Sequence, residues 1–489
     1  MTFDPTQAAG EPLLVDDSSL AFPPRFVYIE TMGCQMNVYD SERMTEVLAN
    51  RGYRPTDRVE MADLVLINTC SIRDRVEHKV VSMLGTLRKL KAHNPELVLG
   101  VTGCVAQQEG QKLLDKVPFL DLVLGPDQIP NLPDLVDNVR QQQQRISATE
   151  FVKAKQYAFP PAQPPEDGRV TSFITIMKGC NKICSFCIVP FTRGREVSKP
   201  SAEVLDEIRM LVASGVREVT LLGQNVNSYG KDRIDRDGNK NELDFPELLA
   251  AVSTIDGLHR IRFTTSHPMD CTDALIDAFA TLPKLVPFFH LPIQSGSESV
   301  LQGMRRAHGV TDYLAKIARL KALKPGIALS TDIIVGFPGE TEADFQKTLD
   351  LLAEVRYASI FSFMYSARPG TKAADLVDDV PLPVKKERLG RLQALQDGIT
   401  REWMAEFLGQ EIEVLFEGAS RLSQAGPNSQ LALKSMGTPQ VMGRTPENVK
   451  VNVGVTDARA QTEWAGRVGR VRIERVGPHS LEGVMLGWA

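Results

Sequence analysis

The sequence predicts a multidomain α/β protein with an N-terminal open parallel α/β sheet, a central partial (β/α)6 barrel and a small C-terminal β-barrel. Apolar strand-like runs alternate with helical segments before residue 140 and again after residue 169, an order typical of parallel βαβ units. The last stretch instead has short strand-like runs separated by Gly- and Ser-rich turns. At roughly 100–200 residues per domain, a chain of 489 residues is expected to form about three domains.

The N-terminal domain is expected at residues 25–140. Residues 1–24 lack the basic start and apolar run of a signal peptide and are expected to be a disordered tail. Residues 141–168 are rich in Gln and Pro, which predicts a linker with one edge strand. Four strands are expected in the domain, each followed by polar or helix-forming sequence, at 25–34, 62–70, 96–104 and 119–126.

The central domain is expected at residues 169–400. A complete eight-stranded barrel usually needs about 250 residues, so six strands fit this shorter segment better. Ser201 is the expected N-cap of the first long helix, and residues 229–244 are expected to be a solvated insertion. The six strands are expected within 171–179, 217–224, 259–267, 286–294, 327–337 and 357–366.

The C-terminal domain is expected at residues 401–475, after a helix that starts near Val384. Strands are expected at 410–418, 448–453 and 466–476. Residues 420–442 are expected to be a loop inserted in this barrel, and residues 476–489 a tail.

Composition excludes several classes of protein. The net charge of −5 gives no global basic field of the kind that attracts nucleic acid, so any RNA contact needs a local patch. The sequence contains no run of about 20 apolar residues, so no membrane span is expected. Seven cysteines without an export signal argue against a disulfide framework and favour the cytoplasm, where clustered cysteines more often bind metal or act in catalysis.

Three cysteines follow three predicted strands of the N-terminal sheet. Cys34, Cys70 and Cys104 come directly after apolar runs. The carboxyl ends of parallel strands meet at one edge of a sheet, where open α/β sheets bind ligands. The three thiols are therefore expected to lie together and are able to hold an iron–sulfur cluster through three irons. The alternative is three buried structural cysteines, since free cysteine is among the most buried residue types.

A second group of cysteines has the spacing CxxxCxxC, at Cys180, Cys184 and Cys187. They follow the first strand of the predicted barrel, on the face where barrel enzymes build active sites. A structural zinc site would need a fourth Cys or His ligand, and a ferredoxin cluster a fourth thiolate, yet neither follows nearby. Three thiolates instead leave one iron of a 4Fe-4S cluster open to a ligand. Cys271 has no partner in the sequence and is interpreted as an ordinary thiol.

The CxxxCxxC motif with Phe186 before its last cysteine resembles the radical S-adenosylmethionine enzymes. The chain is similar to their methylthiotransferase branch from about residue 25 to residue 375, and the terminal barrel resembles the RNA-binding TRAM domain. The similar segments are "TMGCQMNVYDSE", "NTCSIRD", "GCNKICSFCIVPFTRGRE", "LLGQNVNSYG", "HLPIQSGSE", "STDIIVGFPGET" and "FMYSARPGTKAA".

The resemblance implies a tRNA methylthiotransferase. It implies conversion of N6-(dimethylallyl)adenosine beside the anticodon to its 2-methylthio derivative, with two 4Fe-4S clusters and two molecules of S-adenosylmethionine. The loop cysteines would hold the radical cluster, and the strand-end cysteines a second cluster at which sulfur is delivered. The alternatives are a related enzyme acting on threonylcarbamoyladenosine in tRNA or on a ribosomal protein aspartate, and a non-enzymatic electron carrier or zinc-braced RNA-binding protein.

The resemblance also implies cofactor contacts at strand ends, although turns favour glycine and polar residues for structural reasons alone. The expected contacts with the methionine end of S-adenosylmethionine are Gly223, Gln224 and Asn225. Those with its ribose are Gln294, Ser295 and Gly296, and Asp332 and the turn 336–340 are expected to border its adenine. Arg306 is expected to meet a carboxylate, and Phe186 to lie against the cofactor.

The expected macromolecular partner is tRNA, bound through an anticodon stem-loop that carries the isopentenylated adenosine. The C-terminal domain has as many acidic as basic residues, so it offers little charge for RNA. A basic segment beside the loop cysteines is either a site for anticodon-loop phosphates or merely a solvated loop. It has Lys178, Lys182, Arg193, Arg195 and Lys199 against Glu196. An external electron donor such as a flavodoxin or ferredoxin, a sulfur donor system and a monomeric state are also expected.

Overall fold

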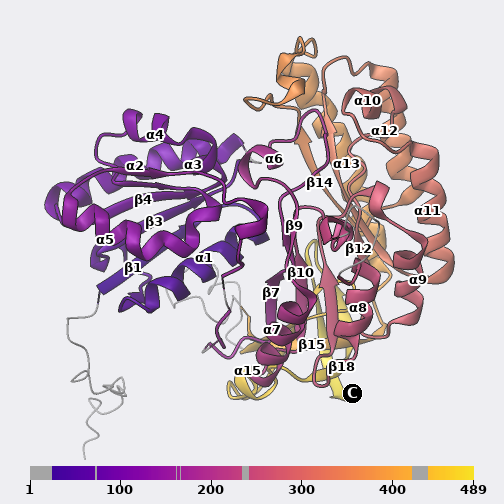
Figure 1. Cartoon of the computed structure of the whole chain (residues 1–489). Coiled ribbons are helices and arrows are strands. Elements are labelled where there is room, and N and C mark those ends of the chain that lie inside the picture. The colour runs from indigo at the N-terminus through magenta and orange to yellow at the C-terminus, as the bar shows by residue number, and fades with distance from the viewer. Residues whose placement is uncertain (1–24, 72–73, 161, 166, 234–241, 421–438) are drawn as a thin grey trace, which may run out of the picture.

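The computed structural model describes residues 25–71, 74–160, 162–165, 167–233, 242–420 and 439–489. The expected N-terminal tail lies outside these residues, as do half of the expected insertion at 229–244 and most of the loop at 420–442. Figure 1 shows the N-terminal α/β unit beside the central barrel, with the C-terminal barrel below the strands β7 and β10. None of the described helices combines the length and the apolar character that crossing a membrane requires.

The N-terminal unit is an open sheet of six parallel strands in the order β2-β1-β3-β4-β5-β6. This confirms the fold class expected here. The two edge strands have only three residues each, too few for a sequence pattern, although the sixth is the edge strand expected in the linker. The strands are β1 (Arg25–Thr31), β2 (Tyr53–Pro55), β3 (Leu64–Thr69), β4 (Val98–Gly103), β5 (Leu122–Leu124) and β6 (Ile146–Ala148).

Helices cover both faces of this sheet. Successive strand residues point to opposite faces, so that Leu64 and Leu66 pack on α1 and α5, whereas Val65 and Ile67 pack on α2, α3 and α4. This double burial explains why β3 and β4 read as continuous apolar runs. The helices are α1 (Gln35–Ala49), α2 (Asp74–His93), α3 (Cys104–Glu109), α4 (Gln111–Lys116) and α5 (Leu132–Gln142).

The central unit has the six strands that the sequence predicts, in two parallel three-stranded sheets with the orders β11-β10-β7 and β12-β13-β14. An isolated bridge between Ile261 and Leu285 connects the two sheets. Ser201 begins α7 but does not cap it, which makes that prediction wrong; its backbone N–H donates to Glu242 Oε2 at 3.0 Å. The strands are β7 (Thr171–Thr175), β10 (Glu218–Leu222), β11 (Arg260–Phe263), β12 (Phe288–His290), β13 (Ala328–Val335) and β14 (Ser359–Met364).

Helices surround these strands and share one large apolar core with them. The long last helix, α13, packs against β14 and α12 and leads to the C-terminal barrel. The helices are α7 (Ser201–Ala213), α8 (Phe245–Ser253), α9 (Asp273–Thr281), α10 (Glu298–Gly303), α11 (Val310–Leu323), α12 (Glu342–Val355) and α13 (Leu382–Ala405). A short ribbon of β8 (Met177–Lys178) and β9 (Val197–Ser198) and the helix α6 (Val189–Thr192) lie near the N-terminal unit.

The C-terminal unit is a closed five-stranded barrel in the order β15-β16-β17-β19-β18. The tail expected from residue 476 is wrong, because β19 pairs with both β17 and β18 and closes the barrel. Its sequence has no regular alternation of apolar and polar residues, and only Leu481 is fully buried, which weakens the sequence signal. The strands are β15 (Glu411–Ala419), β16 (Gln440–Arg444), β17 (Lys450–Gly454), β18 (Val468–Val476) and β19 (Ser480–Trp488).

Two arginines of β11 attach this barrel to the central unit. Arg262 Nη1 and Nη2 donate to the carbonyls of Pro446 and Thr445 at 2.8 and 3.0 Å, and Arg260 Nη1 donates to that of Arg444 at 2.8 Å. Glu218 neutralises the charge, since its Oε1 lies 2.6 Å from Arg262 Nε. Guanidinium groups therefore hold the barrel through its main-chain acceptors.

Replacing Arg262 by Ala is expected to lower the free energy of unfolding by about 3 kcal/mol, the lower end for breaking a buried pair. The expected loss of stability is at the lower end because Arg260, 3.9 Å from Glu218, still partly neutralises the carboxylate. Denaturant unfolding measures it, and limited proteolysis should release the C-terminal barrel earlier. Arg470→Ala, at an exposed arginine of β18, is the control; equal losses in both variants would contradict the docking role.

Candidate active site

The structure brings Cys34, Cys70 and Cys104 together at the carboxyl edge of the N-terminal sheet. They follow β1, β3 and β4, which are adjacent and parallel. All three line one cavity of about 440 Å³ between this edge and the central unit, here named the strand-end cavity. We call the three residues the strand-end triad. The convergence expected from the strand ends is therefore present.

The turn before α1 fits the strand-end triad closely. Gly33 has a φ of +135°, and a Cβ there would lie 2.4 Å from Cys70 Cβ, so only glycine allows this approach. The Asn37 side-chain amide donates to Asn68 Oδ1 and to the Thr69 carbonyl at 3.0 and 2.9 Å. These buried bonds fix the end of β3 against the start of α1.

A buried cation from the central unit faces the strand-end triad. Arg193, which follows α6, donates from Nε to Cys104 Sγ at 3.3 Å, and its Nη2 lies 2.6 Å from Asp40 Oδ2. The pKa of Cys34 falls to about 6, mainly through a hydrogen bond with Cys70, and the charge of Arg193 adds to this effect. The thiolate is the form that ligates metal, so this environment suits a metal centre.

The loop triad, Cys180, Cys184 and Cys187, lies between β8 and α6. All three line a second cavity of about 240 Å³ at the carboxyl ends of the central strands, the loop cavity. Burial raises the pKa of Cys180 and of Cys187 to about 12, so both are neutral thiols in the metal-free protein. A metal centre reverses this, because a coordinating thiol loses its proton outright.

Two polar side chains lie close to the Cys184 sulfur. The sequence did not indicate that either of them contacts a cysteine. Arg306 Nη1 donates to Cys184 Sγ at 3.4 Å, whereas the sequence suggested only a carboxylate partner. His267 Nδ1 accepts from the Met269 N–H at 3.2 Å, which leaves the ring proton on Nε2, 3.9 Å from the same sulfur. Burial and the charge of Arg306 lower the pKa of His267 to about 2, so the ring is neutral.

His308 stacks edge-on against His267, with ring centroids 5.5 Å apart. Neither of its buried ring nitrogens has a hydrogen-bond partner among the described residues. Burial lowers its pKa to about 3. Isolated histidines give no sequence signal: His267 follows β11, and His308 follows α10.

His308→Phe is expected to make stability less sensitive to acid. The pKa of His308 in the folded state lies below the ordinary 6.5. Below pH 6.5 the histidine of the unfolded chain therefore binds a proton, whereas that of the folded chain stays neutral. Stability is therefore complete above pH 6.5 and falls as the pH drops toward 3. One proton contributes at most about 1.4 kcal/mol per pH unit. Urea unfolding at pH 5 and 7 measures the difference; an unchanged pH slope in the variant would contradict it.

The two cavities share one wall. Thr265 in this wall has a φ of +69°, which is strained for a β-branched residue, and Gln294 on the loop cavity has a φ of +83°. Such strain concentrates at functional sites. The residues that line both cavities are Val189, Gln224, Thr265, Asp332 and Phe363.

Most cofactor contacts expected from the sequence lie at these cavities. Gln224 Nε2 and Asn225 Oδ1 are buried and have no partner in the described part of the chain, so each is available to a bound polar group. This donor and acceptor fit the amino-acid end of S-adenosylmethionine. Gly223 lines the strand-end cavity, Gln224 and Asp332 line both, and the loop cavity is also lined by Phe186, Asn225, Gln294 and Arg306.

Ser295 and Gly296, expected at the ribose, line neither cavity. They pack on α12, where the Gly296 N–H donates to Thr348 Oγ1 at 3.0 Å. A Cβ on Gly296 would lie 2.5 Å from the Lys347 carbonyl oxygen. The glycine is therefore explained by close packing of a helix, not by a cofactor contact in this structure.

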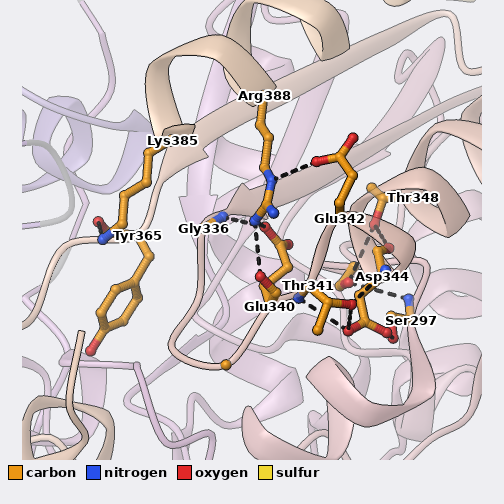
Figure 2. A network of polar contacts seen from close by, with 12 residues as sticks. Ser297, Gly336, Glu340, Thr341, Glu342, Asp344, Thr348, Tyr365, Lys385 and Arg388 are labelled. Atoms are coloured by element: carbon orange, nitrogen blue, oxygen red, sulfur yellow. Dashed lines mark hydrogen bonds and ion pairs between the residues drawn. The ribbon is translucent and has the colours of Figure 1, made fainter. Parts of the chain in front are cut away.

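The turn 336–340 has a structural role as well. Figure 2 shows the buried Glu340 accepting from the Gly336 N–H at 2.7 Å and from Arg388 Nη1 at 2.8 Å. Arg388 also reaches Glu342, 3.3 Å from its Nε. These contacts tie the end of β13 to α13, and Gly336, Glu340, Glu342 and Arg388 line neither cavity.

The basic patch expected to hold anticodon phosphates is not a free surface, so that prediction is wrong. Four of its five cations pair with carboxylates, and three of those four are buried. Only Arg195 is exposed. The pairs are Lys178 with Asp127, Lys182 with Asp270, Arg193 with Asp40, and Lys199 with Glu207.

In the described ranges, no three Cys, His, Asp or Glu side chains lie close enough together to hold a single metal ion. Each cysteine triad instead borders a cavity of its own. Three cysteines around a cavity provide the donor set for three irons of a 4Fe-4S cluster. The residues present therefore fit such a cluster at each triad.

Comparison with known proteins connects both units to families. Residues 26–125 match the uncharacterized protein family UPF0004, and residues 174–352 match the radical SAM superfamily. The chain is 48% identical over 460 residues to the tRNA-2-methylthio-N(6)-dimethylallyladenosine synthase of Myxococcus xanthus, with 93% of each chain covered. It is 49% identical over 461 residues to the synthase of that name from Geobacter metallireducens, covering 94% of this chain and 98% of the relative.

Among solved structures, the radical S-adenosylmethionine methyltransferase TsrM from Kitasatospora setae, with cobalamin and a 4Fe-4S cluster bound, is similar in fold. The TM-score is 0.52 at 14% identity, and the match covers 72% of this chain and 77% of that one. At this identity the likeness concerns the fold alone.

Proposed function

The chain belongs to the family of tRNA-2-methylthio-N(6)-dimethylallyladenosine synthases, and from this premise we propose that its two cysteine triads divide the reaction between them. The protein is a radical S-adenosylmethionine transferase that methylthiolates tRNA, and it uses S-adenosylmethionine and 4Fe-4S chemistry. In our proposal the substrate is N6-(dimethylallyl)adenosine beside the anticodon, and two molecules of S-adenosylmethionine are used.

The loop triad is proposed to hold the cluster that works with S-adenosylmethionine. When bound, this pair supplies the one-electron chemistry needed to remove a hydrogen that is not acidic. Gln224 and Asn225 offer an unpartnered donor and acceptor to the amino-acid end of the cofactor. Arg306 and the neutral His267 donate toward Cys184 and orient it.

The strand-end triad is proposed to hold a second 4Fe-4S cluster, at which sulfur is delivered. The common wall of the two cavities is the observation that carries this proposal. An adenine base placed against Thr265 and Phe363 faces both triads at once, because these two residues line both cavities. Arg193 fixes the orientation of Cys104 on the sulfur side.

We further propose a cytoplasmic monomer that receives electrons from a flavodoxin or ferredoxin and sulfur from a separate donor system. A tRNA substrate and six clustered free cysteines support this setting.

Nucleoside analysis tests the proposed function. The purified protein is reconstituted with iron and sulfide under anaerobic conditions and supplied with S-adenosylmethionine and a one-electron reductant. It should then convert isopentenylated tRNA to the 2-methylthio nucleoside, as read by mass spectrometry. Transfer instead to threonylcarbamoyladenosine or to a ribosomal protein aspartate would favour the related enzymes. Cleavage of S-adenosylmethionine with none of these products would refute the transferase proposal, and no cleavage at all would favour an electron carrier.

A further inference from the structure

A third cavity, of about 520 Å³, lies at the amino-terminal ends of the central strands. The C-terminal barrel contributes Glu417, Arg444 and Asn448 to its lining, and we call it the barrel-floor cavity. It lies at the opposite end of the strands from the loop cavity. Its outer lining is exposed at Asn448 and at Asp167, whose side chain is 54% exposed, so this end reaches solvent.

The barrel-floor cavity adjoins the strand-end cavity. Residues two apart on one strand point to the same side. In two such pairs, the earlier residue lines the barrel-floor cavity and the later residue lines the strand-end cavity. Thr220 lines the barrel-floor cavity and Leu222 the strand-end cavity, and Ser330 and Asp332 repeat this order on β13. The two cavities have five lining residues in common, which are Gln35, Phe173, Thr264, His290 and Phe361.

The inward residues explain why this lumen is not filled. In a complete eight-stranded barrel, bulky branched apolar side chains pack the interior into a core. Here the corresponding strands carry short polar side chains at Thr171, Thr220 and Ser330. The partial barrel thus has a lumen with short polar side chains at its floor, and Phe173 and Phe361 line it where it meets the strand-end cavity. We call the two adjoining cavities the passage.

We propose that this passage is the entry route of a small sulfur co-substrate, of the hydrosulfide or low-molecular-weight thiolate class, to the strand-end triad. The inference rests on the proposed function, in which each product molecule removes one sulfur atom. A tRNA that presents its base at the shared wall covers the carboxyl ends of the strands. The barrel floor remains open, and a cavity of about 520 Å³ admits small molecules while it excludes a nucleic acid.

The charges along the passage suit a small polar solute. Arg262 faces Glu218 with 2.6 Å between Nε and Oε1, and Arg444 Nε lies 2.9 Å from Glu417 Oε1. Arg169 Nη2 pairs with Asp167 Oδ2 at 2.7 Å. Glu42 also pairs with Arg169, so four carboxylates neutralise the three arginines of this lining. The lining therefore has no unpaired cation that would bind a small anion tightly and stop it there.

The passage is tested by obstruction. Thr220→Phe and, on the neighbouring strand, Thr171→Phe place a large ring in the lumen, whereas Thr220→Val keeps the shape and Thr220→Ala widens it. The probe is inorganic selenide, a heavier analogue of sulfide whose arrival at the strand-end triad X-ray absorption detects. Each substitution is made in the full chain that also carries Cys180→Ala, Cys184→Ala and Cys187→Ala, so that only the strand-end cluster is present.

The expected result depends on tRNA. With tRNA bound, either plug slows selenide binding at least tenfold relative to Thr220→Val, and Thr220→Ala does not slow it. Without tRNA, plugged and control proteins bind selenide at similar rates, because the carboxyl side is open. Equal rates with tRNA bound would overturn the proposal. If the Phe substitutions slow selenide binding equally with and without tRNA, the proposal is also overturned, because the substitutions would then damage the strand-end cluster itself.

A kinetic measurement in the wild-type background adds a second readout. Thr220→Phe should raise the sulfide concentration needed for half-maximal turnover at least tenfold, while the first turnover of protein preloaded with sulfide stays unchanged. An unchanged sulfide requirement would contradict the passage. If the wild-type protein makes no methylthio nucleoside, the proposed function fails, whereas selenide binding still decides the entry route.

Discussion

Cys180→Ala is expected to abolish cleavage of S-adenosylmethionine, whereas Cys34→Ala is expected to retain cleavage and lose the methylthio product. The two residues belong to different triads that line different cavities, so each substitution removes a ligand from one centre only. Loss of one of three thiolates leaves a cluster with two protein ligands. Each variant should therefore lose one centre and keep the other.

Iron content and product analysis measure this separation. Two 4Fe-4S clusters carry about eight irons per chain, so anaerobically purified variants should each hold about four. Formation of 5′-deoxyadenosine reports on the loop triad, and the tRNA nucleoside reports on both. Cys271→Ala is the matched control, because Cys271 is a buried thiol that lines neither cavity. Bound zinc, or loss of all iron in either variant, would contradict two independent centres.

Arg193→Met is expected to lower the free energy of unfolding by about 3–5 kcal/mol, because it leaves Asp40 buried without its cation. Both side chains of this pair are less than a tenth exposed, and they connect the central unit to the N-terminal unit. The same substitution removes the N–H that donates to Cys104 Sγ. Hydrogen bonds to cluster sulfurs help to set the reduction potential, so the potential of the strand-end centre should fall.

Two further variants separate these effects. Arg195→Met, at the exposed arginine of the same loop, should change neither stability nor potential. The double variant Arg193→Met with Asp40→Leu should recover most of the stability in denaturant unfolding, because no buried charge is left unpaired. Its potential, read by redox titration of the strand-end centre, should remain low. A double variant as unstable as the single one would contradict the ion-pair account.

Much of the fold could be predicted because its signals are local. Cys34, Cys70 and Cys104 each follow an apolar strand, and parallel pairing alone brings them to one edge. The six central strands each combine an apolar run with a turn. The strand β19 was missed because most of its residues face outward or pack only partly, which leaves no clear alternation.

The role of the basic segment near the loop triad could not be predicted, since its partners come from distant parts of the chain. Lys178 pairs with Asp127, and Lys182 pairs with Asp270. These carboxylates lie in other elements, and only the folded chain brings them against the segment. A count of charges in a window therefore suggested a phosphate site where the structure has internal ion pairs.

Strain and orphaned polar atoms were equally beyond sequence reasoning. Gln224 and Asn225 could be proposed from their strand end, but their unpartnered donor and acceptor required the packed structure. The positive φ of Thr265 gives no signal in the sequence, because threonine rarely adopts it. The site was thus located by its cysteines and refined by its surroundings.

The arginines that attach the C-terminal barrel grip carbonyl groups, which every residue type possesses. Substitutions at residues 444–446 therefore leave the attachment intact, provided that the backbone conformation of this segment is unchanged. The surface residues of the C-terminal barrel can therefore change during evolution without loss of the attachment. For the same reason, a different barrel could be fused to the central unit if its backbone presents carbonyl groups to the same two arginines.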